Sequence, residues 1–522
     1  MKTILHKKSI IQKTLQVSCS TFMSRILGII REYFIVKYLG AGVVSDAFFT
    51  AFKIPNSLRK IFAEGALSAA FIPTFVSIIH KEDRRNANRL MSLSFLFFES
   101  IVLILCTLVM WKAELVLRTI APGFSVEQIK FAAPYLRILM PFIFFISSSA
   151  LLAGALQSVN HFFVPAFSPV LLNIVFVSAL IVCLIKQLPV EYLCFFILLG
   201  GLTQFLLHIV TYFKLHFSFD CIDTYAWKTF KDVLKKFIPC TIAMSVMEMS
   251  LFIDTSFASY LPPGSISLLR YANRFMGIPL GVFAVAFSTI LLPHFSRVST
   301  YAPKRLSFYL LEAAKLILWV TLPVALMMGF FGEKIFSTLF LSKKFTFTQV
   351  VEAHSILIAF LIGLFFFSLN KIILNVYYAR HSTLLPTIVA VIATIINIGF
   401  NILLMRIWNA TGLALATSLS IGLIQTILLL IFVRVMFDFR LYILPFLIFG
   451  ARYCVQLVIV LTFMTGVYYV SEKFVAVLPS VLANFMLIGL GYWLWVGPLC
   501  IISMLILFYT KELFAVRLYF LD

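Results

Sequence analysis

The sequence predicts an all-α protein that crosses a membrane many times. Of its 522 residues, 62% are hydrophobic and only 12% are charged, whereas soluble domains carry about 25% charged residues. The mean hydropathy is +1.04. Apolar stretches of roughly 20 residues, the length that a helix needs to cross the hydrocarbon core, recur along the whole chain. A membrane β-barrel would instead show alternating segments of about ten residues.

Short polar breaks separate the apolar stretches and predict about fourteen transmembrane helices. We place these helices near residues 10–37, 45–79, 90–111, 131–158, 163–185, 191–213, 233–260, 266–296, 306–331, 347–378, 384–405, 411–436, 443–470 and 482–510. Several are longer than a bilayer requires. We therefore expect tilted or kinked helices, with kinks at prolines such as Pro55, Pro141, Pro279 and Pro323.

Three landmarks recur at a nearly constant offset and predict an internal repeat. They are YLGAG (38–42) with YLPPG (260–264), FIPTF (71–75) with LLPHF (291–295), and Pro165 with Pro386. The members of these pairs lie 222, 220 and 221 residues apart. We therefore predict two six-helix lobes, 1–220 and 221–440, related by a pseudo-two-fold axis along the membrane normal. Two further helices occupy 441–522.

The distribution of basic residues predicts the orientation of the chain. With the N-terminus in the cytoplasm, the cytoplasmic segments hold about twice as many Lys and Arg residues as the outer segments, as the positive-inside rule requires. The same orientation places the C-terminus in the cytoplasm, because the number of helices is even. The net charge of +21 is dispersed over the loops, so it does not predict a nucleic-acid partner.

Sequence signals of catalysis are missing. The eight cysteines form no CxxC pair, and the eight histidines form no HExxH cluster. We find no Walker loop, no dinucleotide fingerprint and no GxSxG elbow, which argues against ATP hydrolysis and covalent catalysis. The chain is predicted to be a transporter rather than an enzyme, with no organic cofactor.

Four of the arginines inside predicted membrane helices point to an anionic substrate. They are Arg25, Arg31, Arg59 and Arg274. A charge at membrane depth costs about 2.5–3.5 kcal/mol on insertion scales, so such residues usually face a wet interior. The arginines outnumber the acidic residues near them, and a guanidinium group suits bidentate binding of phosphate oxygens. We therefore predict a water-filled cavity for a phosphate-bearing substrate.

Acidic residues of the first two helices are predicted to temper this positive charge. Glu32 lies seven residues after Arg25, on the same helix face, where the two could pair. Glu64 follows Lys60 at the spacing of a helical ion pair, and Asp46 opens the second helix. For lysines such as Lys60 and Lys53, internal pairing or snorkelling to the interface is the favoured interpretation.

A second polar group is a candidate cation site. Asp254 lies in the middle of an apolar helix, Asn397 and Asn401 share one face of a later helix, and Thr417 follows in the next helix. One carboxylate with amide and hydroxyl oxygens suits a hard cation such as sodium. The alternative is a hydrogen-bond network between helices, and the residue pattern alone leaves both open.

Three stretches together resemble the MurJ/MviN lipid II flippases, which share a superfamily with multidrug exporters of the MATE type. They are SRILGIIRE (24–32), the run from GAG at 40 to FIPTF ending at 75, and RYANRFMGIPLGVFAVAFSTILLPHFS (270–296). The resemblance implies two six-helix lobes around a V-shaped cavity and a lipid groove formed by the last two helices. It also implies export of lipid II, the undecaprenyl-pyrophosphate-linked peptidoglycan precursor, across the bacterial inner membrane by alternating access.

The resemblance also assigns roles to residues. It places Arg25, Arg31, Arg59 and Arg274 at the head group of the lipid, Glu32 and Asp46 at acidic positions of the first lobe, and Asp254, Asn397, Asn401 and Thr417, with a carbonyl near Leu413, at a sodium site. This chain departs from the family pattern at Asn273 and Gly277, where many members carry acids. Arg274 therefore has fewer acidic partners here. Cell-wall synthesis and division proteins are the partners that the resemblance suggests.

Two other transport functions remain open at this point. A flippase for another polyprenyl-linked oligosaccharide, of the capsule or O-antigen type, would suit the same arginines. A MATE-type exporter of small cations would call for an acidic cavity, which the arginine excess disfavours. The 24–77 stretch is what favours the peptidoglycan precursor.

Overall fold

The chain is helical almost throughout. The computed structural model describes residues 7–81, 83–302, 305–380, 382, 384–434, 440–477, 479, 485–487, 489 and 491–521. Within these ranges, the one extended pairing is an isolated bridge between Ser342 and Phe345. The helices group into two compact units, Met1–Ser267 and Leu268–Asp522.

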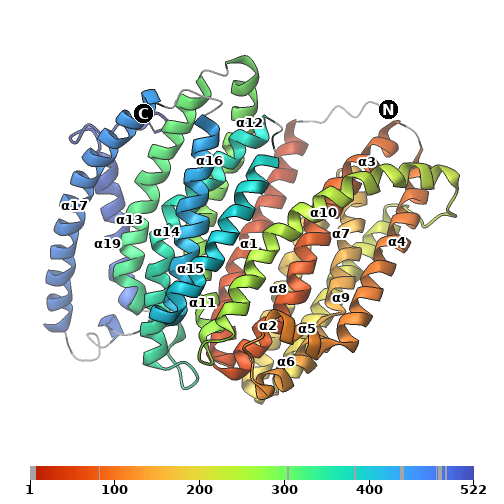
Figure 1. Cartoon of the computed structure of the whole chain (residues 1–522), viewed down its shortest axis with the longest axis horizontal. Coiled ribbons are helices and arrows are strands. Elements are labelled where there is room, and N and C mark those ends of the chain that lie inside the picture. Colours follow the sequence, from red (N-terminus) through yellow and green to blue (C-terminus); the bar gives the residue numbers. More distant parts are fainter. Residues whose placement is uncertain are drawn as a thin grey trace. The chain divides into compact units, whose positions relative to one another are not determined.

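The first unit consists of long helices that pack side by side (Figure 1). They are α1 (Lys7–Leu39), α2 (Val43–Arg59), the π-helix η1 (Lys60–Leu67), α3 (Ser68–Lys81), α4 (Arg84–Trp111), α5 (Ala113–Ile120), α6 (Val126–Leu139), α7 (Phe142–Ser158), α8 (Phe163–Lys186), α9 (Val190–Lys214) and α10 (Thr224–Ala258). Helix α1 packs along α8, and α8 packs along α9. Helix α10 lies against η1, α3 and α4.

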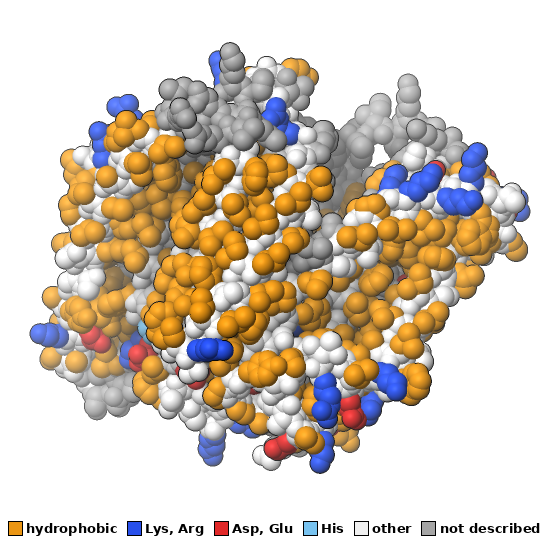
Figure 2. Space-filling model, viewed as in Figure 1, with side chains coloured by type: hydrophobic (Ala, Val, Ile, Leu, Met, Phe, Trp, Pro, Cys, Tyr) orange, Lys and Arg blue, Asp and Glu red, His pale blue; other side chains and the backbone are white. Residues whose placement is uncertain are grey.

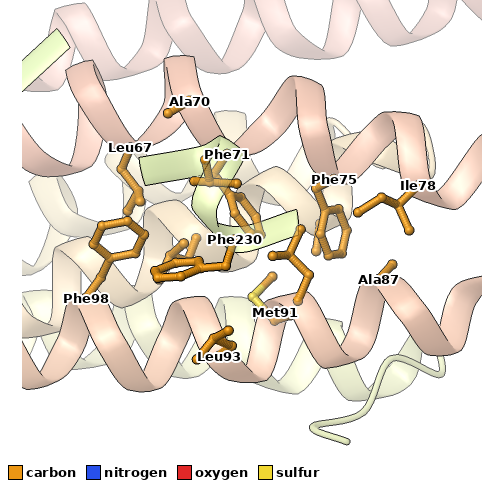
Figure 3. Packing of buried hydrophobic residues seen from close by; sticks show 14 of the residues in the cluster. Leu67, Ala70, Phe71, Phe75, Ile78, Ala87, Met91, Leu93, Phe98 and Phe230 are labelled. Atoms are coloured by element: carbon orange, nitrogen blue, oxygen red, sulfur yellow. The ribbon is translucent and has the colours of Figure 1, made fainter. Parts of the chain in front are cut away.

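An aromatic core holds α10 in the first unit. Phe98 of α4 lies 5.7 Å from Phe230 and 4.7 Å from Phe237, both on α10, between ring centroids. Phe71 and Phe75 of α3 belong to the same buried cluster (Figure 3). Aromatic rings bury large areas and favour such tilted and edge-on contacts. The repeat predicted that α10 begins the second lobe, and the lobe boundaries at 220 and 440 stay a prediction.

The second unit contains the remaining helices. They are α11 (Ser265–Pro279, whose first turn belongs to the first unit), the π-helix η2 (Leu280–Val285), α12 (Ala286–Tyr301), α13 (Leu306–Phe340), α14 (Phe347–Ala379), α15 (Leu384–Thr417), the π-helix η4 (Ser418–Ile424), α16 (Gln425–Arg434), α17 (Arg440–Val477) and α19 (Gly491–Tyr509). Helix α14 packs against α13, α15, α12 and η4. Helix α17 packs against α13 and α19.

Ten helices in the described part of the chain are long and apolar enough to cross a membrane. Hydrophobic side chains cover the middle of the helices on the visible face, and most Lys and Arg side chains lie near helix ends (Figure 2). This confirms a multi-pass helical membrane protein. Every expected helix range overlaps a helix, but the total of fourteen spans stays a prediction. Helices α1, α2 and α10 are not among the ten, and they carry many of the charges discussed below.

Several helix interruptions coincide with sequence features. The π-helices η1 and η2 begin at residues 60 and 280, the same offset as the FIPTF and LLPHF landmarks. Pro141 separates α6 from α7. The expected break between 405 and 411 is a kink at Asn409, whose φ is 49°. Gly412 is required there, because a Cβ atom would lie 2.1 Å from the carbonyl oxygen of Leu404.

Candidate functional site

The side chain of Arg31 is held between α1 and α8 by a polar and an aromatic side chain of α8. Its Nη1 donates to Oδ1 of Asn173 at 2.9 Å, and its guanidinium carbon lies 5.2 Å from the ring centroid of Phe176. Asn173 in turn donates to the carbonyl and hydroxyl oxygens of Ser24, at 3.2 and 3.1 Å. A guanidinium fixed by a hydrogen bond and an aromatic face loses less freedom when it binds an anion.

The carboxylate of Glu32 pairs with Arg31 and not with Arg25. Nη2 of Arg31 lies 3.2 Å from Oε1 of Glu32, so the expected pair between Arg25 and Glu32 is wrong. Arg31 is drawn to α8 by Asn173, and Glu32, only 6% exposed, follows it inward. Arg25 is exposed, on a segment of α1 whose apolar residues Phe22, Ile26 and Ile29 are also exposed.

The charges of α2 and η1 make partly different contacts from those expected. Arg59 is half-buried, and its Nε donates to Oδ1 of Asn56, three residues earlier in α2, at 3.2 Å. Lys60 forms an ion pair at 3.1 Å with Glu248 of α10. The expected partner of Lys60 was Glu64, whose side chain lies outside the described residues. Long-range packing thus supplies an acid that helical spacing does not reveal.

Lys53 also binds α10. Its Nζ donates to the carbonyl oxygen of Leu251 and to the hydroxyl group of Thr255. Both lysines therefore join α2 and η1 to α10 within the first unit, as the preference for internal pairing of these lysines predicted.

Asp46 caps the beginning of α11. Its carboxylate accepts hydrogen bonds from the backbone N–H groups of Gly264 (2.6 Å) and Ser267 (2.8 Å), and from the Ser267 hydroxyl at 2.6 Å. Asp46 is 2% exposed. Gly264 has a φ of +101°, and a Cβ atom there would lie 3.1 Å from the carbonyl oxygen of Ala41. A buried carboxylate at a helix N-terminus is favoured by the helix dipole and by the unpaired N–H groups.

Arg274 is exposed on α11 in the second unit. Asn273 beside it is also exposed, and nothing lies within 4 Å of a Cβ atom built on Gly277. At these two positions, where many family members were expected to carry acids, this chain has the amide side chain of Asn273 and no side chain at Gly277. This part of α11 is strongly basic, since Arg270 lies one turn before Arg274.

The residues of the candidate cation site fall in both units. Asn397 and Asn401 are fully buried in α15, where Nδ2 of Asn401 donates to Oδ1 of Asn397 at 3.0 Å. Nδ2 of Asn397 donates to the hydroxyl of Ser420 at 3.0 Å, and Thr417 donates to the carbonyl of Leu413. Asp254 is half-buried on α10 in the first unit. The described residues contain no group of three or more His, Cys, Asp and Glu side chains arranged for a metal.

A pocket lies between α13, α17 and α19. It encloses about 230 Å³ and is lined mainly by apolar side chains, which include Leu326, Phe330, Phe331, Leu461, Met464 and Leu499. Tyr468 and Ser503 are among its few polar residues. The pocket therefore belongs to the two helices that were expected to form a lipid groove, together with α13.

A family model described as lipid II flippase MurJ matches residues 35–488. The chain belongs to the MurJ family. It is 33% identical over 419 residues to a probable lipid II flippase MurJ of Haemophilus influenzae, which covers 77% of this chain and 82% of that protein. A lipid II flippase MurJ of Burkholderia cenocepacia is 32% identical, with 80% and 82% covered.

Solved structures agree with this membership. A lipid II flippase MurJ in an inward closed conformation matches with a TM-score of 0.77 and 28% identity, covering 96% of this chain and 99% of that one. An inward-facing MATE family multidrug transporter matches with a TM-score of 0.67 at 14% identity, covering 78% and 92%. The second likeness concerns the fold alone.

Within this MurJ family member, sequence reasoning missed Asn173 and Glu248, which bind two of the predicted charges. A polar residue in an apolar helix is the only signal either of them gives. Asn173 lies in the run SPVLLNIVF and Glu248 in the run AMSVMEMSLF. Their importance depends on which helices become neighbours, and that is decided by the fold.

Proposed function

We propose that this chain moves lipid II from the inner to the outer leaflet of a bacterial cytoplasmic membrane by alternating access. The observation that carries the proposal is the set of guanidinium groups presented by membrane helices of a MurJ family member. Arg25 and Arg274 are exposed, and Arg31 is fixed between Asn173 and Phe176. The pyrophosphate of lipid II is the anion that these groups would bind.

Arginine chemistry supports this substrate class. Guanidinium groups bind phosphate oxygens in a bidentate manner and stay charged at any physiological pH. Arg31 would bind with its side chain already oriented, whereas Arg25 would have to become ordered on binding. Glu32 would compensate the charge of Arg31 when no substrate is bound. Asp46 and Glu64 are the further acids that we assign to gating.

The mechanism needs no covalent step. The head group would enter from the cytoplasmic side, while the polyprenyl tail stays in lipid beside the apolar pocket between α13, α17 and α19. The inside-negative potential favours outward movement of anionic charge by about 2.3 kcal/mol per charge per 100 mV. The same field favours the inward return of an empty, positively charged site. We place both termini in the cytoplasm, where cell-wall synthesis and division proteins could contact the chain.

We further propose a sodium site that involves Asp254, Asn397, Asn401 and Thr417. The donor set suits sodium, because amide, hydroxyl and carboxylate oxygens are its usual ligands. In the second unit, Asn397 and Asn401 are buried side by side. Asp254→Asn should then weaken the stabilisation of the protein by sodium in detergent. The exposed control Asp232→Asn should not. An equal response to sodium in both variants would contradict the proposed site.

The decisive experiment measures lipid II movement with purified protein. The full chain is reconstituted in vesicles with fluorescent lipid II, and the labelled lipid accessible in the outer leaflet is followed over time. We expect movement with the chain and none in empty vesicles. A vesicle carrying another polyprenyl-linked oligosaccharide tests specificity. Transport of that lipid but not of lipid II would overturn the proposal.

Substitutions in cells that depend on this protein test the arginines. Arg25, Arg31, Arg59 and Arg274 are each replaced by Ala, and exposed Lys235→Ala serves as the control. We expect growth to fail for the arginine variants at normal protein levels and to persist for the control. Normal growth and precursor export in all four arginine variants would contradict the proposed role of these residues in substrate binding.

A further inference from the structure

Glu99 is a carboxyl group in the middle of a membrane helix that the proposed function does not use. It lies on α4, which is long and apolar enough to cross a membrane, and it is 3% exposed. At 1.5 Å per residue, both ends of α4 are roughly 20 Å away along the axis. The side chain therefore cannot reach either surface of the bilayer.

The polar groups that meet Glu99 are serine hydroxyls of α7. The Ser147 hydroxyl of α7 donates to Oε1 at 2.6 Å. Oε2 and the hydroxyl oxygen of Ser148 are both buried, and neither makes a well-aligned hydrogen bond among the described residues. Ser148 lies beside the carboxyl group. A proton on Oε2 would be donated to the Ser148 hydroxyl and would satisfy both atoms at once.

No described cation faces this carboxyl group. Helix α7 offers only serine hydroxyls, and α10 turns Phe230 and Phe237 toward α4. The lysines of α10 near this site, at 228, 231, 235 and 236, are all exposed, and α3 contributes Phe71 and Phe75 to the core.

The other charged groups of α5 and α6, Arg118, Glu127 and Lys130, are exposed. Arg137 pairs with Glu114 at 3.7 Å near the end of α4. The titratable neighbour of Glu99 is the thiol of Cys106, whose Sγ lies 3.5 Å from the carbonyl oxygen of Met140. An ionised carboxylate in such surroundings would be far costlier than a protonated one.

We propose that Glu99 is a proton-binding site and that its proton is exchanged against lipid II during the transport cycle. The inference rests on the proposed function. The site takes a proton from the outer aqueous phase, which converts the carboxylate to the neutral acid. It releases that proton to the cytoplasm and becomes a carboxylate again. The proton adds positive charge to the inward return of the empty carrier, the step that the membrane potential already favours.

The first test reads the protonation state directly. Infrared difference spectra of the purified chain are recorded at neutral pH for the wild type and for Glu99→Gln. We expect the carbonyl band of a buried protonated acid in the wild type and its loss in the variant. Exposed Glu114→Gln should leave the band unchanged. A carboxylate band for Glu99 at neutral pH would overturn the proposal.

The second test measures coupling in the lipid II vesicle assay. The leaflet that receives lipid II is made more acidic by about one pH unit, with equal sodium on both sides; this gradient corresponds to up to about a tenfold change in distribution per proton. We expect the wild type and Glu114→Gln to respond and Glu99→Gln not to respond. If the wild type moves lipid II without any response to the gradient, the proton site is wrong while the proposed function stands.

A further variant covers the case in which Glu99→Gln does not fold. Ser147→Ala keeps the carboxyl group and removes its hydrogen-bond donor. We expect it to retain the response to the gradient with a changed pH midpoint. An unchanged midpoint would mean that Glu99 does not carry the coupled proton. If the wild type moves no lipid II at all, the proposed function itself fails.

Discussion

Two contacts in the first unit use the same kind of charge in opposite ways. Between α2–η1 and α10, the basic groups form contacts inside the fold. Lys60 pairs with Glu248, and Lys53 binds Thr255 and the α10 backbone. Between α1 and α8, Asn173 fixes Arg31, while Arg25 is exposed. The lysines on α2 and η1 therefore stabilise the unit, whereas the proposed function assigns the arginines on α1 to the ligand.

The largest effect is expected at Arg25. Arg25→Ala should lower the rate of lipid II movement in vesicles roughly 10- to 100-fold, since a charge-assisted hydrogen bond contributes about 1.5–3 kcal/mol. Thermal unfolding in detergent should change by less than about 0.5 kcal/mol, because an exposed side chain supports little of the fold. A clear loss of stability with normal transport would show that Arg25 stabilises the unit, as Lys60 and Lys53 do, and does not bind the substrate.

A smaller effect is expected when the support of Arg31 is removed. Asn173→Ala deletes the hydrogen bonds to Arg31 and Ser24 and should destabilise the unit by about 1–2 kcal/mol. Transport should fall roughly fivefold, because Arg31 keeps its charge and loses its orientation. Measuring transport at several lipid II concentrations checks this account. Transport equal to that of the wild type would show that the position of Arg31 does not matter.

The smallest effect on transport is expected at the ion pair between η1 and α10. Lys60→Met should lower stability by about 1 kcal/mol, the value typical of partly exposed pairs, and leave lipid II movement within about twofold. Lys60→Glu combined with Glu248→Lys should recover stability, as measured in a double-mutant cycle of thermal unfolding. A loss of transport that the reversed pair does not restore would move Lys60 into the substrate site.

The sequence could predict the helices but not the partners of their charges. Apolar length alone located helices such as α8 and α9, because the need to satisfy backbone hydrogen bonds in lipid leaves helices as the solution. Local spacing suggested that Arg25 pairs with Glu32 and Lys60 with Glu64. The first pair is not formed, and Lys60 pairs with Glu248, 188 positions along the chain.

Composition and short runs of residues were enough to predict a membrane environment, a helical class, a family resemblance and an excess of arginine in the membrane helices. None of these predictions depends on a tertiary contact. The packing of the helices was needed to show that Asp46 caps α11, that Asn173 holds Arg31 and that Glu99 contacts a serine of α7. Hydrogen bonds and ion pairs act over a few ångströms, so their partners are fixed by helix packing and not by distance along the chain.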